Sequence, residues 1–421
     1  MKTPRPRRTA ALCLAFGLAA FSGAFAGTLT VRPGVPNVGG LARYNGTHGL
    51  EVNVASPSRS ASFVQSSHPS GEATYRARFY VNLRGLSMSN GDELDLFAAY
   101  DGADPTPPTI SGNAVVRVVV RQAGGVKLLS AFVRTDIGFE TEIADEIPLT
   151  NGWRGVEINW ARATAAGANN GRFDLWVDGG APKQSLVNLD NDTSTINYAR
   201  LGTVTGVDTG TSGIIKLDDF ASQRTGYIGL ITLFTDVPSS SSFWPFVQGL
   251  YASEITTGCA TGLFCPNDNV TRATMAVFLE RAMRGPGFTP PAATGVFADV
   301  PTSYWAAAFI EQFRNDGITT GCASGPLRFC PENLVTRAEM AVFLLRAKYG
   351  SSYVPPAATG TRFTDVSSSY WAAAWIEQLA NEGITTGCTA SSYCPETVVP
   401  RWQMAVFLVR TFGLPQQQVG S

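Results

Sequence analysis

A motif with a period of 63 to 66 residues occurs three times in the second half of this chain, and it constrains the fold more than any other feature. The tetrapeptide Phe-x-Asp-Val begins at residues 234, 297 and 363. The pentapeptide Ile-Thr-Thr-Gly-Cys begins at 255, 318 and 384, with the same two spacings. A fixed period of this size indicates a small structural unit repeated along the chain.

Each copy contains two short stretches with helical periodicity. In the middle copy, Trp305, Phe309 and Phe313 follow at four-residue steps, which predicts an amphipathic helix that ends at Asn-Asp-Gly, residues 315 to 317. A second helix is expected to begin at Thr336, where Thr-Arg-Ala-Glu can form a capping box and the buried stripe would be Met340, Phe343, Leu344 and Ala347. One such unit has too small a core to fold comfortably alone, so we expect the copies to pack together.

The first 26 residues have the three parts of a secretory signal peptide. Basic residues stand at 2, 5, 7 and 8, an apolar run covers 10 to 21, and Ala-Phe-Ala at 24 to 26 offers a cleavage site. The apolar run is shorter than the roughly 20 residues that a membrane span needs. The C-terminal tail has neither an apolar anchor nor a basic end, so retention at a cell surface is expected to be noncovalent.

Six cysteines follow the signal peptide, in three close pairs. In an exported protein such pairs favour disulfides, and zinc sites are the alternative. Both histidines, His48 and His68, lie far upstream of the pairs. The sequence therefore favours local disulfides and no metal at Cys259 with Cys265, Cys322 with Cys330, and Cys388 with Cys394.

Residues 27 to 232 have a different pattern, with short alternating or apolar runs separated by turn residues. Such runs predict an all-β sandwich. Strands are expected at 75–83, 115–121, 127–133, 154–160 and 172–177. The net charge of -1 gives no reason to expect nucleic acid as a partner.

The repeated motifs resemble those of S-layer homology modules, which bind polymers attached to peptidoglycan. Phe-x-Asp-Val, a tryptophan near the first helix, Ile-Thr-Thr-Gly, and Cys-Pro before Val-Thr-Arg carry the resemblance over residues 233 to 413. It implies an all-α array of three repeats at 233–288, 296–350 and 362–413, with a cell-wall or envelope polysaccharide in grooves between neighbours. The residues implied to line these grooves are Arg272, Arg337, Arg401, Trp244, Trp305, Trp371, Asp236, Asp299 and Asp365.

The copies differ at the turn that carries the arginine. Only the middle copy reads Thr-Arg-Ala-Glu; the first ends in Thr274, and the third reads Pro-Arg-Trp-Gln at 400 to 403. We therefore expect Arg337 to mark the best-formed site and Arg401 the weakest. A tryptophan at a helix start is more often part of a core than a ligand contact, so the arginines are the stronger candidates. A guanidinium can bind a carboxylate through two parallel hydrogen bonds.

Parts of the N-terminal region resemble a concanavalin A-like or laminin-G-like jelly roll. The stretches that carry this resemblance are residues 152–160, 171–179 and 217–220. Because that fold hosts lectins, hydrolases, lyases and inert spacers, it does not name a function.

Two acidic motifs in this region are candidates, one for a catalytic site and the other for a metal site. Family 16 glycoside hydrolases carry Glu-x-Asp-x-Glu on one strand, and here Glu93 and Asp95 are followed by Phe97. The missing second carboxylate argues against that activity, and we interpret Glu93 and Asp95 as the polar face of an edge strand. The pair at 218 and 219, Asp-Asp, could contribute to a calcium site, although no full ligand set is evident.

The sequence thus predicts an exported, noncatalytic surface protein of a bacterium, without a required cofactor. A β-sandwich, with an extracellular glycan as its candidate ligand, would be held to the cell envelope by three S-layer homology-like repeats. Two alternatives stay open: a surface polysaccharide hydrolase or lyase with its active site in the sandwich, and a self-associating component of a surface layer.

Overall fold

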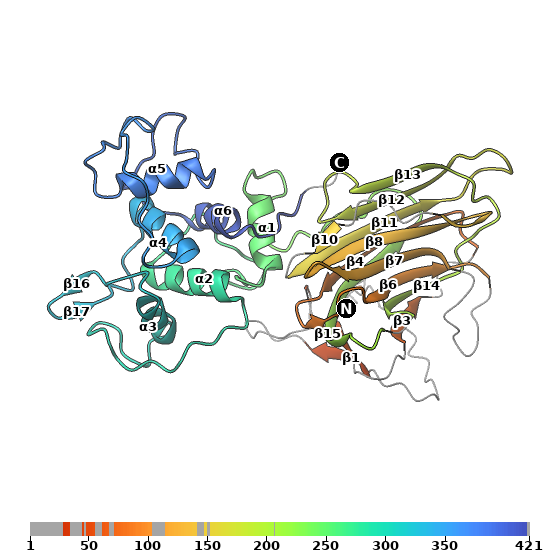
Figure 1. The fold of residues 1–421 in the computed structure, drawn as a ribbon, viewed down its shortest axis with the longest axis horizontal. Coiled ribbons are helices and arrows are strands. Elements are labelled where there is room, and N and C mark those ends of the chain that lie inside the picture. The colour runs from red at the N-terminus through yellow and green to blue at the C-terminus, as the bar shows by residue number, and fades with distance from the viewer. Residues whose placement is uncertain are drawn as a thin grey trace, which may run out of the picture.

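The computed structural model of the chain describes residues 28–33, 44–45, 48–54, 61–66, 71–102, 114–140, 147–149, 152–205 and 207–418. A β-sandwich and a group of helices lie side by side (Figure 1). The predicted signal peptide lies outside the described residues. Among the helices described, none combines the length and the apolar character needed to cross a membrane.

The N-terminal part consists of two antiparallel sheets. One contains, in spatial order, β1 (Thr28–Pro33), β2 (His48–Val54), β15 (Ser212–Gln223), β4 (Thr74–Asn82), β11 (Trp153–Ala161), β12 (Gly171–Val177) and β13 (Gln184–Leu189), with β5 (Leu86–Ser87) paired to β15. The other contains β10 (Ile147–Leu149), β8 (Val126–Thr135), β7 (Ala114–Ala123), β6 (Glu93–Tyr100), β14 (Tyr198–Thr203) and β3 (Ser62–Ser66), with β9 (Gly138–Glu140) paired to β8.

The strand predictions for this part are confirmed. The five predicted runs correspond to β4, β7, β8, β11 and β12, and their alternating apolar residues point into one core between the sheets. Phe79, Val118, Ile158 and Phe173 are fully buried members of that core. The all-β sandwich is therefore confirmed.

The interpretation of Glu93 and Asp95 as part of an edge strand was wrong. Their strand, β6, lies inside its sheet and pairs with both β7 and β14. Asp95 is 1% exposed, and Arg117 donates from Nε to both carboxylate oxygens at 3.1 Å. A buried charge is tolerated there because an oppositely charged neighbour pairs with it.

The C-terminal part contains two helices per copy. They are α1 (Trp244–Ala252) and α2 (Arg272–Arg284), α3 (Ala307–Asn315) and α4 (Arg337–Tyr349), and α5 (Ala373–Asn381) and α6 (Arg401–Phe412). A short ribbon of β16 (Ala323–Ser324) and β17 (Leu327–Arg328) lies within the middle copy. The first helix of that copy starts later than predicted, so Trp305 precedes α3 and is 63% exposed instead of joining the buried stripe.

Local signals in the repeat are confirmed where they concern loops and caps. Disulfides join each of the three predicted cysteine pairs. Thr336 and Glu339 form the predicted capping box at the start of α4. At α2 the Thr271 hydroxyl accepts the amide of Thr274, whereas Pro400 gives α6 no side-chain cap.

The three copies close into a ring through one short backbone segment in each. The amide of Val335 donates to the carbonyl of Val270, that of Val399 to Val335, and that of Val270 to Val399, at 2.9 to 3.0 Å. The second helix of each copy packs on the first helix of the next, as α2 on α3, α4 on α5 and α6 on α1. A single apolar core runs through all three copies. The expectation that they pack together is therefore confirmed.

The first copy also packs against the sandwich. Ala252 at the end of α1 lies in an apolar cluster with Tyr44, Tyr80 and Trp153, and the rings of Tyr44 and Tyr80 stack at 3.9 Å. The chain returns to the sandwich after α6, where the Tyr44 hydroxyl donates to Gln417 Oε1 at 3.0 Å. Contacts at both ends of the helical part thus hold it to the sandwich.

Glu254 shows that the first copy is adapted to this contact. Its φ of 62° is left-handed, and the equivalent positions in the other copies are Gly317 and Gly383, with φ of 70° and 69°. The carboxylate of Glu254 pairs with Arg84 of the sandwich, Nη1 to Oε2, at 2.8 Å. The interaction between the two parts therefore stabilises a backbone conformation that usually requires glycine.

We expect Arg337→Ala to lower the free energy of unfolding by about 2 to 4 kcal/mol, because it removes buried hydrogen bonds that join two copies. The midpoint of urea unfolding measures this. Arg314→Ala is the control, since Arg314 is exposed on α3, and it should change the stability by less than about 0.5 kcal/mol. Equal effects of the two substitutions would contradict a structural role for Arg337.

Glu254→Gly should change the stability differently in two backgrounds, with little net effect when Arg84 is present and a gain when it is absent. With Arg84 present, the relief of left-handed strain, about 1 kcal/mol, is offset by loss of the ion pair. In the Arg84→Ala background only the relief remains, so Glu254→Gly should raise the unfolding midpoint. Urea unfolding of all four proteins gives the coupling between the two residues, and additive effects would contradict it.

Candidate functional site

The three repeat arginines lie at the junctions between copies, one at each junction. We name these the Arg272 junction, between the first and second copies, the Arg337 junction, between the second and third, and the Arg401 junction, between the third and first. Each guanidinium donates from Nε to a backbone carbonyl of the next copy, at Phe329, Tyr393 and Phe264 respectively, over 2.7 to 2.9 Å. The same carbonyl residue presents its ring to the guanidinium at 4.6 to 4.9 Å.

Two of the three arginines are buried and the third is half-buried. Arg272 is 4% and Arg337 2% exposed, and Arg401 is half-buried. Burial lowers the pKa of all three guanidinium groups, yet arginine keeps its charge in proteins. Their first role in the fold is therefore to join neighbouring copies.

The third residue of each second helix decides how fully the arginine of the preceding copy is paired. Glu339 accepts from Arg272 Nη1 at 3.0 Å, and Gln403 accepts from Arg337 Nη1 at 2.8 Å. The equivalent residue at the Arg401 junction is Thr274, whose side chain is too short for this contact. Among the described residues, Arg401 donates only from Nε, and its buried Nη2 has no partner.

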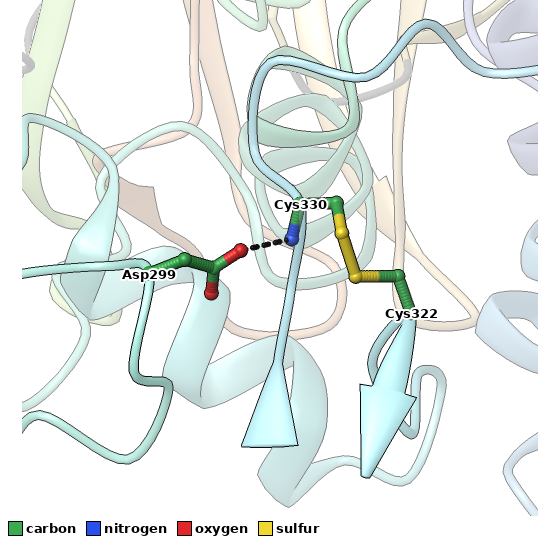
Figure 2. A group of neighbouring side chains, drawn as sticks. All are labelled: Asp299, Cys322 and Cys330. Atoms are coloured by element: carbon green, nitrogen blue, oxygen red, sulfur yellow. Dashed lines mark hydrogen bonds between the residues drawn. A yellow bond between two sulfur atoms is a disulfide. The ribbon is translucent and has the colours of Figure 1, made fainter. Parts of the chain in front are cut away.

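The predicted aspartates hold the cysteine loops. Asp299 accepts the amides of Phe329 and Cys330 at 2.9 and 2.8 Å, and Figure 2 shows its carboxylate directed at the Cys330 amide beside the closed disulfide. Asp236 and Asp365 make the same two bonds in their own copies. Because the cysteine sulfurs are bonded to each other, they cannot act as thiolate ligands for zinc.

The tryptophans divide into two groups. Trp305 and Trp371 are 63% and 60% exposed, whereas Trp244 is 1% exposed and lies in the core. The spacing of 63 residues between the first two copies explains the difference, because it aligns Trp305 with Ser242 and Trp244 with Ala307. Trp244 is therefore not equivalent to Trp305 and Trp371. The first copy has Ser242 at the position where the second and third copies have an exposed tryptophan.

Sequence reasoning missed the side chains that accompany the exposed tryptophans. The Tyr304 hydroxyl donates to Glu332 at 2.6 Å, and the Tyr370 hydroxyl donates to Glu396 at 2.5 Å. Burial, together with the carboxylate, raises the pKa of each tyrosine to about 12. The signal was present as Ser-Tyr-Trp and Cys-Pro-Glu, which recur in the second and third copies only.

Of the two acidic residues Asp218 and Asp219, the first already accepts backbone hydrogen bonds with its carboxylate. Asp218 Oδ2 accepts the amides of Tyr44 and Asn45 at 2.6 and 2.9 Å, so this carboxylate anchors the segment that contacts the helices. Asp219 Oδ2 is buried without a partner, and burial next to Asp218 raises the pKa of Asp219 to about 6. Calcium at this position stays a prediction.

Parts of this chain are similar to known proteins, several of which are named as cell-surface proteins. Residues 233–276 match the S-layer homology domain. An endoglucanase of Bacillus sp. (strain KSM-635) is 35% identical over 114 residues, 27% of this chain and 11% of that protein. The S-layer protein of Bacillus thuringiensis subsp. finitimus is 27% identical over 191 residues, 45% of this chain and 22% of its own length.

A cellulosome-anchoring protein of Acetivibrio thermocellus (strain ATCC 27405) is 25% identical over 156 residues, 37% of this chain and 34% of that protein. The solved structure of the cellulose induced protein Cip1 aligns with 49% of this chain and 90% of its own, at 13% identity and a TM-score of 0.32. This chain spans less than a quarter of the length of the endoglucanase and the S-layer protein. Together, the domain match and the cell-surface relatives identify a secreted cell-surface protein that carries an S-layer homology domain at residues 233–276.

Proposed function

We propose that this protein is a noncatalytic surface protein that three S-layer homology-like repeats hold noncovalently to a polysaccharide of the cell envelope. The observation that carries the proposal is the domain match at residues 233–276, together with the closed ring of three equivalent copies. Relatives named as an S-layer protein and a cellulosome-anchoring protein support surface retention. The sandwich would be the displayed part, and a glycan-binding role for it belongs to the same proposal.

Polymer contacts at the Arg272 and Arg337 junctions would come mainly from Trp305 and Trp371. Both indoles are exposed, and each has its neighbouring tyrosine ring at 5.9 or 5.8 Å with the two rings tilted by 44°. The exposed indole would provide an apolar face for a sugar ring. Arg272 and Arg337 would act there as positioning residues, because their terminal nitrogens already donate to protein acceptors.

The Arg401 junction would bind an anionic group of the polymer. Arg401 is the repeat arginine whose terminal nitrogens donate to no described side chain, and Thr274 leaves space where the other junctions have Glu339 or Gln403. A carboxylate of the polymer would pair with the accessible part of this half-buried guanidinium, whereas the buried Nη2 lies outside its reach. Half-buried Trp402 stacks on Phe243 at 5.4 Å beside this arginine and would face the attached sugar. The order expected from the sequence, with Arg337 first, is reversed in this proposal.

Two observations bear on catalysis in the sandwich. Glu93 and Asp95 are tied to Arg121 and Arg117 at 2.6 and 2.7 Å, and Phe97, in the place of a second glutamate, is buried in the core. These contacts favour a noncatalytic sandwich. The endoglucanase relative keeps polysaccharide hydrolysis as the competing function, and a screen of the full chain on assorted glycans tests it. Turnover that Glu93→Gln abolishes would overturn the noncatalytic proposal.

Replacing Trp305 and Trp371 together by Ala should weaken binding to purified cell-wall sacculi by roughly tenfold or more, since each exposed indole would lose a sugar contact. Co-sedimentation with sacculi measures the bound fraction. Val354→Ala is the control, because Val354 is 80% exposed and outside the junctions. Unchanged binding of the double variant would exclude these indoles from the contact.

Thr274→Glu should separate the structural and binding roles of Arg401. The new carboxylate completes the capping box with Thr271 and can pair with Arg401, which should raise the stability by about 1 kcal/mol. It would also occupy the donors proposed for the polymer, so retention on sacculi should fall. The matched control is Gln403→Glu, where Arg337 is already paired, and retention should stay unchanged. Stronger retention of Thr274→Glu would contradict the proposed anionic contact.

A further inference from the structure

A buried carboxyl group distinguishes the first copy from the other two. Glu280 lies eight residues after Arg272 on α2, and the residues eight positions after Arg337 and Arg401 are Leu345 and Val409. All three side chains are buried, with Glu280 at 0% exposure. Burying an acid where the other copies bury an aliphatic side chain is costly unless the acid has a specific role or is neutral.

Two carboxyl groups share one guanidinium at this position. Arg284 donates from Nε to Glu280 Oε2 at 3.2 Å, and from Nη2 to both carboxylate oxygens of Asp316 at 2.7 Å. Glu280 and Arg284 belong to α2, whereas Asp316 follows α3, so the group spans the first and second copies. Glu280 Oε1 accepts no hydrogen bond among the described residues. One guanidinium between two carboxylates leaves one negative charge in excess.

Apart from Arg284, no arginine of the surrounding elements hydrogen-bonds to Glu280 among the described residues. Arg346 of α4 donates to the Ile318 carbonyl, Arg410 of α6 to Ile384 and Arg281 of α2 itself to Ile255. On α3, Glu311 is held by the amides of residues 294 to 296. Asp316 and Arg284 line a cleft of about 260 Å³ with Met283, Ile318, Arg346, Ala347 and Gly350, so solvent reaches them but not Glu280.

The equivalent contact between the second and third copies has no counterpart of Glu280 among the described residues. There Lys348 of α4 pairs with Glu382, after α5, at 2.7 Å, and Gln378 donates to the same carboxylate at 2.8 Å. Leu345 fills the place of Glu280. That contact therefore provides a comparison within the same chain.

We propose that Glu280 is a pH-sensitive latch between the first two copies, closed while its carboxyl group is protonated and hydrogen-bonded to Asp316, and strained once it ionises. Burial, and then the charge of Asp316, raises the pKa of Glu280 to about 7 from an ordinary value of 4.5. The folded protein thus holds a proton that the unfolded chain releases. Stability contributed by the latch is fully present below about pH 4.5 and is lost as pH rises through about 7.

Thermal unfolding of the full chain at pH 5.5 and pH 8.5 tests the latch, with Glu280→Gln as the principal variant. The wild-type midpoint should fall by roughly 5 °C between pH 5.5 and pH 8.5. The midpoint of Glu280→Gln should fall much less, because its side chain stays neutral at both pH values. Glu280→Leu, which copies the second repeat, should behave in the same way. A pH dependence of Glu280→Gln equal to that of the wild type would overturn the proposal.

Two further measurements test whether the pH dependence comes from the carboxyl group of Glu280. Glu382→Gln alters the comparison contact, and it should shift the midpoint equally at both pH values because Glu382 has a pKa below its ordinary range. Proton release on unfolding at pH 6 should be greater by nearly one proton for the wild type than for Glu280→Gln. Equal release would contradict a protonated Glu280 even if Glu280→Leu failed to fold.

Discussion

Closure of the ring between the three copies is the constraint on which the rest of the helical part depends. One backbone hydrogen bond joins the segment before each second helix to that of another copy, and one buried arginine donates to a carbonyl of the next copy. A copy alone would expose these groups and its part of the shared apolar core to water, and it would lose the burial that stabilises the ring. This accounts for the presence of arginine in all three copies while the residue two positions later varies among Thr274, Glu339 and Gln403.

Departures from the repeat mark contacts made outside it. Glu254 replaces a left-handed glycine because its carboxylate meets Arg84 of the sandwich, and Ala252 enters an aromatic cluster with Tyr44 and Trp153. Glu280 replaces an aliphatic residue at a contact where Asp316 and Arg284 are present. At the Arg401 junction, Thr274 leaves an arginine incompletely paired. The first copy, which contributes to each of these exceptions, is thus the specialised member of the ring.

Features that depend on neighbours in sequence were predictable. The capping box of Thr336 and Glu339, the disulfides and the strands β4, β7, β8, β11 and β12 all follow from short-range patterns. The candidate site was less predictable. Arg337 appears in sequence as a polar residue at a helix start, yet it is buried by Tyr393 and Gln403, which lie more than 50 residues away. Trp305 appears as part of an apolar stripe, yet it precedes α3 and faces solvent.

The sequence by itself determined the repeat, its two helices per copy, the paired cysteines and a sandwich of alternating strands, because periodicity and short spacings encode local structure directly. Only the tertiary structure decided which of the repeated side chains are buried and which are exposed to solvent. It placed β6 inside its sheet, buried Trp244 and left Trp371 exposed. The physical reason is that burial and hydrogen-bond saturation depend on the next copy around the ring, and no segment contains the residues that will cover it.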